Sequence, residues 1–142
     1  MGTAHDTNLN PLIILQKKCI RIINRADYLD HTEPLFKSTK LLKLGQIHIL
    51  SCVKFIYNCY KSCTYSNFRA RLIQNSQIHD HNTRIASDLR APYERLEIGL
   101  NSFFNKGIKI WNKLPSDIKS ANSIIYFKYR VKKWIFESTI IL

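Results

Sequence analysis

Cysteine and histidine are the residues of this chain whose chemistry is easiest to recognise from spacing. Cys59 and Cys63 stand four apart, and His79 and His81 follow in a polar stretch. A structural zinc site brings four such ligands together, normally at tight paired spacings. Cys59, however, belongs to an apolar run, where free cysteine commonly serves as a small hydrophobic side chain. We therefore expect no metal and no cofactor, with zinc as the minor alternative.

Other catalytic patterns are missing from the sequence. No serine or cysteine stands in a nucleophile motif, and four scattered glycines do not make a phosphate-binding loop. Nucleotidyl transfer by two metal ions requires clustered carboxylates, whereas the aspartates of this chain are isolated from one another. The prediction is that the chain is not an enzyme by itself.

Positive charge is the strongest compositional feature. The 142 residues contain 22 Lys and Arg against 10 Asp and Glu, a net charge of +12, and such an excess attracts polyanions. Residues 106–133 alone hold eight Lys or Arg and one acid. Tyr126 and Tyr129 lie among them and could stack on single-stranded bases, whereas Trp111 and Trp134 fall on apolar stripes and are expected in the core.

RNA, DNA or both are therefore the candidate partners. For the lysines, phosphate contact and simple solvation explain the pattern equally well. The candidate nucleic-acid-binding residues are the basic side chains of the first helix, one arginine of the central polar region and the basic side chains of the last helices: Lys17, Lys18, Arg21, Arg25, Arg84, Lys109, Lys113, Lys128, Arg130, Lys132 and Lys133.

The sequence gives few signs of secretion or membrane insertion. No N-terminal stretch resembles a signal peptide, and four irregularly spaced cysteines do not form a disulfide scaffold. The most apolar window, 47–60, is too short to span a bilayer of about 30 Å. We expect an intracellular chain without a membrane partner, in the nucleus or the cytoplasm.

Helical periodicity dominates the first half of the chain. Asn10 and Pro11 predict the beginning of a helix that continues to about Arg25, and a short helix is expected from about Glu33. The stretch 47–60 is apolar on nearly every helical face, which is typical of a helix buried on several sides or of a docking surface.

The last third predicts two helices joined at a proline corner. Ile108, Trp111 and Leu114 share one apolar face, and Pro115 should end their helix at or before Leu114. A single turn from Ser116 and a final helix capped by residue 122 or 123 should follow. Its apolar stripe consists of Ile124, Phe127, Val131, Trp134 and Ile135.

These elements predict a mainly α fold: a small irregular array of about five helices, with a loop or a short β-hairpin near 78–102. We divide the chain into an N-terminal helical segment (1–63), a polar linker or extended segment (64–102) and a C-terminal basic helical segment (103–142). The two helical segments are expected to belong to one domain, and the oligomeric state stays open.

The order of several short motifs resembles the C-terminal region of reverse transcriptases from non-LTR (LINE-type) retrotransposons, most closely the jockey-like elements. The similarity extends from about Leu9 to Ile135. The motifs that carry it are Gln16-Lys17-Lys18, Arg21-Ile22-Ile23, His31-Thr32, Pro34-Leu35-Phe36, Asn82-Thr83-Arg84, Trp111-Asn112, Leu114-Pro115, Ile118-Lys119 and Phe127-Lys128.

This resemblance implies a thumb-like, post-palm region that helps to hold template RNA and nascent DNA. The metal-binding aspartates of the RNA-directed DNA polymerase are expected upstream, in a polymerase domain that would be a further partner. Two alternatives remain: a protein-interaction module that docks through helix 47–60, and an inert translated relic of a transposable element.

Overall fold

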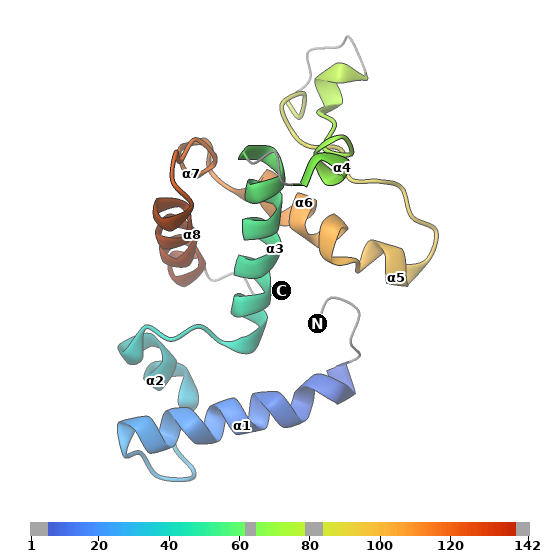
Figure 1. The fold of residues 1–142 in the computed structure, drawn as a ribbon. Helices are drawn as coiled ribbons and strands as arrows, with labels where there is room; N and C mark the ends of the chain where they lie inside the picture. The colour runs from blue at the N-terminus through green and yellow to red at the C-terminus, as the bar shows by residue number, and fades with distance from the viewer. Residues whose placement is uncertain (1–5, 62–64, 79–83, 139–142) are drawn as a thin grey trace.

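The computed structural model describes residues 6–61, 65–78 and 84–138. These residues form eight α-helices and a 3-10 turn (Figure 1): α1 (Asp6–Asn24), α2 (Thr32–Thr39), α3 (Leu44–Lys61), α4 (Ser66–Arg69), η2 (Asn75–Gln77), α5 (Glu97–Leu100), α6 (Phe103–Lys113), α7 (Ser116–Lys119) and α8 (Ile124–Glu137). The prediction of a mainly α fold is confirmed. Its expected five helices correspond to those of eight residues or more.

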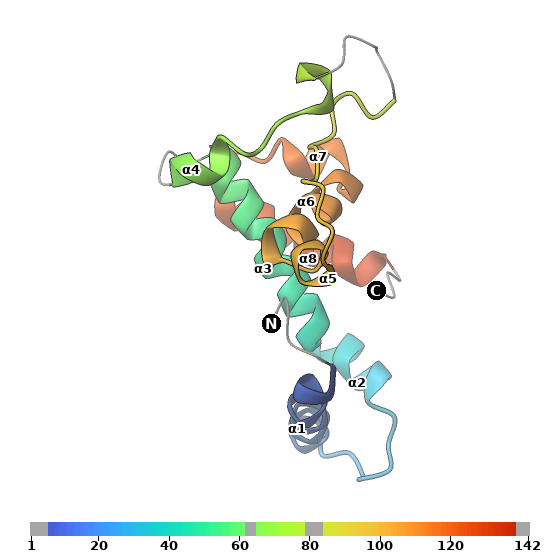
Figure 2. The same ribbon diagram turned by 90° about the vertical axis from the view of Figure 1, so that its right-hand side faces the viewer.

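Helix α3 lies at the centre of the molecule, with α6 and α8 packed against it (Figures 1 and 2). Cys52, Val53 and Ile56 on this helix are fully buried, as are Ile108 of α6 and Phe127 of α8. A helix that is apolar on nearly all faces requires neighbours on several sides, and α3 has them. Its apolar side chains are therefore largely used within the chain.

Helices α3 and α6 approach each other closely at Gly107. A Cβ atom at this position would lie 2.8 Å from Cγ1 of Ile56 and 3.2 Å from the carbonyl oxygen of Cys52. The hydroxyl of Ser102 caps α6 by accepting a hydrogen bond from the Asn105 N–H (3.3 Å). The absence of a side chain at Gly107 thus sets how near the two helices lie.

Pro115 ends α6 as predicted, since Leu114 is already extended (ψ 139°). The single-turn helix α7 and then α8 follow, and the Ser123 hydroxyl accepts a hydrogen bond from the Ile125 N–H at the beginning of α8. The Tyr57 hydroxyl donates to the Ala121 carbonyl (2.9 Å) and so fixes the α7–α8 connection to α3.

Helices α1 and α2 form a two-helix arm below the core (Figure 1). The amide of Gln16 joins the arm to the α2–α3 linker: its Nε2 donates to the Leu42 carbonyl (3.0 Å), and its Oε1 accepts from the Leu44 N–H (2.9 Å). Ile20 is the most buried residue of α1. Arg25 adopts a left-handed conformation (φ 51°) immediately after the helix.

The segment between α3 and α6 has little regular structure. Gln74 and Leu89 form an isolated antiparallel bridge, flanked by a hydrogen bond from the Arg90 N–H to the Ile73 carbonyl (2.8 Å). The side chain of Asn112 then holds this segment on α6, because it accepts from the Leu89 N–H (3.0 Å) and donates to the Leu89 carbonyl (2.8 Å).

Three details differ from the sequence-based expectation. The predicted beginning of the first helix was wrong: α1 begins at Asp6, and Pro11 lies inside it, at the loss of one N–H···O=C bond in its second turn. Within 64–102, the described residues include the short helices α4 and α5 and the turn η2. Near 78–102 the sequence predicted a loop or a short β-hairpin. The described residues there form a loop together with the short helix α5, and only the bridge residue Leu89 is in β pairing.

Candidate nucleic-acid interface

Helix α8 has one buried face and one exposed face, and two tyrosines lie on the exposed face. Phe127, Val131 and Ile135 are buried against the core. Tyr126 and Tyr129 point away from it and are 49% and 65% exposed. The 3.6-residue period produces this separation, since residues three or four apart share a face.

The two tryptophans expected in the core lie on the inner side. Trp111 is buried, with its ring 5.9 Å from that of Phe127, and Trp134 is partly buried against the same core. Phe127 also stacks on Tyr57, with ring centroids 4.2 Å apart. These rings hold α8 on α3, so the tyrosines are the aromatic side chains of α8 that remain available to a ligand.

Basic side chains surround the exposed tyrosines. Lys128 is exposed on one edge of the helix, and Lys133 lies one turn beyond Tyr129. Lys133 pairs weakly with Glu137 (3.6 Å, both side chains exposed), and the Lys132 ammonium lies 5.9 Å from the Phe136 ring centroid. An exposed ion pair of this kind contributes little to stability. Lys133 could therefore leave Glu137 and bind a phosphate at little cost.

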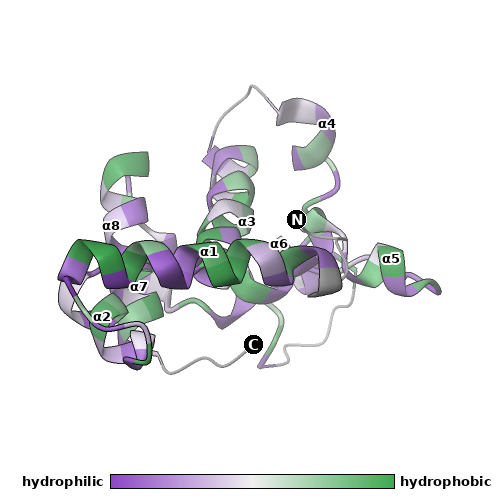
Figure 3. Ribbon diagram, turned by 90° about the horizontal axis from the view of Figure 1, so that it is seen from below, coloured by the Kyte–Doolittle hydropathy of each residue, from purple (hydrophilic) through white to green (hydrophobic). Residues whose placement is uncertain are grey.

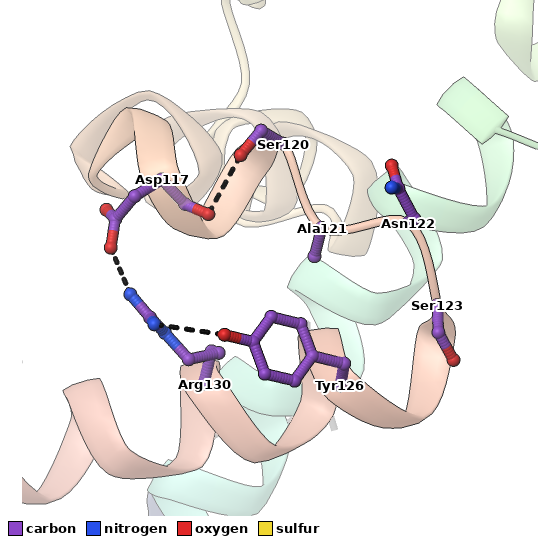
Figure 4. A pocket seen from close by; sticks show the side chains of 7 residues that line it. All are labelled: Asp117, Ser120, Ala121, Asn122, Ser123, Tyr126 and Arg130. Carbon is purple, nitrogen blue, oxygen red and sulfur yellow. Dashed lines mark hydrogen bonds and ion pairs between the residues drawn. The ribbon is translucent and has the colours of Figure 1, made fainter.

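Arg130 has a different environment. Its guanidinium pairs with Asp117 of α7 and donates to the Tyr126 hydroxyl (3.2 Å), as Figure 4 shows. Both groups belong to a shallow hollow of about 490 Å³ at the α7–α8 corner, lined by Asp117, Ser120, Ala121, Asn122, Ser123, Tyr126 and Arg130. Because Asp117 offsets its charge, Arg130 contributes less to the positive potential than the α8 lysines do.

Helix α6 adds a second basic row. Lys109 and Lys113 are one turn apart and exposed, and their side chains make no hydrogen bond or ion pair with the described residues. Lys119 of α7 instead donates to the Asn112 carbonyl (3.3 Å) at the end of α6. Both helices pack on α3, so their basic side chains belong to the same body of the molecule.

The other candidates lie elsewhere. Lys17, Lys18 and Arg25 are exposed on the α1 arm, while Arg21 donates to the Asp30 carbonyl (2.9 and 3.1 Å) and is held in the turn after α1. Arg84 is exposed in the turn that precedes the bridge residue Leu89. The structure therefore divides the predicted basic residues between the arm, this turn and the α6–α8 body.

Two features of this surface are missing from the predicted site residues. Tyr126 and Tyr129 are exposed on α8, and their positions opposite the Phe127-Val131-Ile135 stripe are the sequence signal that indicates this exposure. The two hydrogen bonds between the Asn112 side chain and the Leu89 backbone have no local sequence signal, because they join residues 23 positions apart.

Cys52 and His48 are in contact but do not form a reactive pair. Cys52 Sγ lies 3.5 Å from His48 Nε2, yet burial raises the pKa of the thiol to about 11. Burial, followed by the charge of Lys106, lowers the pKa of His48, and a nucleophilic cysteine requires the opposite shift of its thiol pKa. Burial also raises the pKa of Cys59. The contact between Cys52 and His48 is therefore a packing contact.

The minor zinc alternative involved Cys59, Cys63, His79 and His81, of which only Cys59 lies within the described residues, where it is fully buried. The described part of the chain contains no group of three His, Cys, Asp or Glu side chains placed to hold a metal ion. Nor is any described helix both long and apolar enough to cross a membrane.

No protein-family model, curated protein or solved structure matches this chain.

Proposed function

We propose that this chain is the post-palm, C-terminal region of a non-LTR retrotransposon reverse transcriptase and that it binds nucleic acid without performing chemistry itself. The ordered motifs from Gln16 to Lys128 support the family assignment. The binding role is supported by one observation above the others: Tyr129 is well exposed on α8, with lysines on either side of it.

The outer face of α8 fits a single strand. Lysine side chains neutralise phosphates and release condensed counterions, while a tyrosine ring accepts a base of any identity by stacking, worth about 1–3 kcal/mol per base. Lys109 and Lys113 of α6 would add to the positive charge of the same body of the molecule. In a duplex the bases are already stacked on one another, so the tyrosines would gain no base contact from it.

The test is a fluorescence anisotropy titration of the full chain with a labelled single-stranded RNA and with a duplex of the same length. We expect the single strand to bind more tightly. Tyr129→Ala should weaken its binding by about 5- to 150-fold, the equivalent of one stacked base. If the three α8 lysines each contact a phosphate, log K should fall with log salt with a slope of about −2 from this helix.

Two matched variants locate the interface. Replacing Lys128, Lys132 and Lys133 by Gln should remove most of that slope, whereas Lys17→Gln with Lys18→Gln on the α1 arm should have a smaller effect. If the single strand does not bind at low salt, the binding proposal is wrong. A larger loss from the arm variant than from the α8 variant would move the interface to α1.

A further inference from the structure

Helix α1 contacts the rest of the molecule along one face only. It packs on α2 and on the beginning of α3. Ile20 is buried in this contact, and Ile13, Gln16 and Asn24 are partly buried. The other faces of this 19-residue helix are exposed to solvent.

One of those faces is an apolar stripe. Its members recur at three- and four-residue spacing and are all exposed: Leu12, Leu15, Cys19, Ile22 and Ile23. Ile22 and Ile23 are 77% and 62% exposed. Figure 3 shows α1 across the lower surface of the molecule, with hydrophobic segments along its length. Contiguous exposed apolar surface of this kind marks an interaction site.

The spacing is that of a coiled-coil seam. Leu12, Leu15, Cys19 and Ile22 occupy the first and fourth positions of two consecutive heptads, the positions that pack into a partner helix. The first and last residues of the seam, Leu12 and Ile22, are ten helical positions apart, about 15 Å along the axis. The seam is thus long enough for a specific contact with one helix.

Charge is concentrated on one border of this seam. Lys18 lies one turn from both Leu15 and Ile22, and Arg25 follows directly after the last helical residue, Asn24. Neither basic side chain makes an ion pair with the described residues. Gln16 and Ile23 on the opposite border are uncharged. Flanking charges select the partner in such helix pairs.

We propose that the α1 seam docks a helix of a partner protein that presents an apolar seam of its own and carboxylates facing Lys18 and Arg25. A second copy of this chain fits less well, because two chains that each carry a net charge of +12 repel one another. A second copy also has no acidic residue on either border of its own seam. A lipid surface fits less well too: the stripe lacks the Trp and Phe that commonly anchor interfacial helices.

The proposal is independent of nucleic-acid binding, and two synthetic peptides test it. Both are three-heptad helices with Leu at the seam positions; one has Glu and the other Lys at the flanking positions. In anisotropy titrations of the full chain we expect the Glu peptide to bind, the Lys peptide to bind at least about tenfold more weakly, and salt of about 0.5 M to reduce that difference.

Three variants of the chain make the test specific. Leu15→Asp with Ile22→Asp should weaken binding of the Glu peptide by more than about tenfold, because two seam contacts are lost. Leu29→Asp is the matched control: Leu29 is 87% exposed but lies outside the stripe, in the turn after α1, and its variant should bind normally. Lys18→Glu with Arg25→Glu should reverse the preference toward the Lys peptide.

Circular dichroism of each variant checks that helix content is unchanged. The proposal is overturned if neither peptide binds, if the seam variant binds like the unmodified chain, or if charge reversal leaves the preference unchanged. Binding to phosphatidylserine vesicles that the seam variant abolishes, without peptide binding, would assign α1 to a membrane surface instead. A dimer in light scattering that the seam variant dissociates would assign it to self-association.

Discussion

Replacement of Gly107 by Ala tests the close approach of α3 and α6. The added Cβ would lie 2.8 Å from Ile56 Cγ1, which is 0.6 Å short of the 3.4 Å at which ordinary carbon contacts begin. Ile56 is fully buried and β-branched, so its side chain has little freedom to move away. The Cys52 carbonyl oxygen at 3.2 Å is backbone and cannot rotate aside.

Two effects of this substitution oppose each other. Overpacking a filled core costs about 1–3 kcal/mol, whereas replacing a helical glycine by alanine stabilises the helix by about 1 kcal/mol. We expect the steric effect to be larger and the free energy of unfolding to fall by about 1 kcal/mol. For a chain of this size that corresponds to a Tm about 2–4 °C lower.

Urea unfolding followed by tryptophan fluorescence measures this difference, and Gly45→Ala is the matched control. Gly45 is also helical, near the beginning of α3, and no described atom lies within 4 Å of a Cβ added there. Alanine at position 45 should therefore stabilise the chain by up to about 1 kcal/mol. The Gly→Ala substitution is thus expected to lower the free energy of unfolding at position 107 and to raise it at position 45.

Combining Gly107→Ala with Ile56→Ala shows whether the Ile56 side chain causes the steric cost. Ile56→Ala alone should cost about 2–5 kcal/mol through the cavity that it leaves. In that background the contact with Ile56 is removed while the tighter-than-usual contact with the Cys52 carbonyl oxygen stays. Gly107→Ala should therefore lose most of its cost, with a coupling energy of about 0.5–3 kcal/mol. If Gly107→Ala stabilises the unmodified chain as much as Gly45→Ala does, the two helices lie farther apart than the structure shows.

Three further predictions concern polar side chains. Asn112→Ala should destabilise the chain by about 1–3 kcal/mol, because it leaves the N–H and the carbonyl of Leu89 without their hydrogen-bond partner. Limited proteolysis should then cut the segment between α3 and α6 faster. Tyr57→Phe should lower the free energy of unfolding in urea by about 1–3 kcal/mol, because the buried Ala121 carbonyl loses its donor. His48 has a lowered pKa in the folded chain, so it favours folding above its ordinary pKa of 6.5, and this contribution is lost as pH falls through the folded pKa. The stability difference between the unmodified chain and His48→Gln should therefore decrease from pH 7.5 to pH 5, and a difference that is constant with pH would contradict the shift.

Local signals were sufficient for the C-terminal third of the fold. Pro115 fixes the end of α6 because of its effect on the residue before it, and Ser123 caps α8 through its own hydroxyl. The inward stripe of Phe127, Val131 and Ile135 follows from the helical period. The outward direction of Tyr129, and so the centre of the candidate interface, follows from the same period.

Long-range contacts explain what the sequence could not predict. Periodicity shows that Leu15 and Ile22 share a face of α1, but not that another face, with Ile20, packs on α2 and the beginning of α3. The amides of Gln16 and Asn112 bind backbone groups 23 or more positions away, and a side-chain amide carries no sign of such a partner. The division of the basic residues between α1 and the α6–α8 body likewise depends on tertiary packing.

Gln16 has a mechanical consequence. The large buried cluster extends from Ile49 to Ile135 and includes no residue of α1 or α2. The amide of Gln16, hydrogen-bonded on both sides of Lys43, therefore helps to set the angle at which the arm leaves the α3 axis, together with the ion pair between Lys43 and Glu33 of α2. Without that amide we expect the arm to change its angle about residues 40–43 more easily, while the buried cluster from Ile49 to Ile135 stays closed.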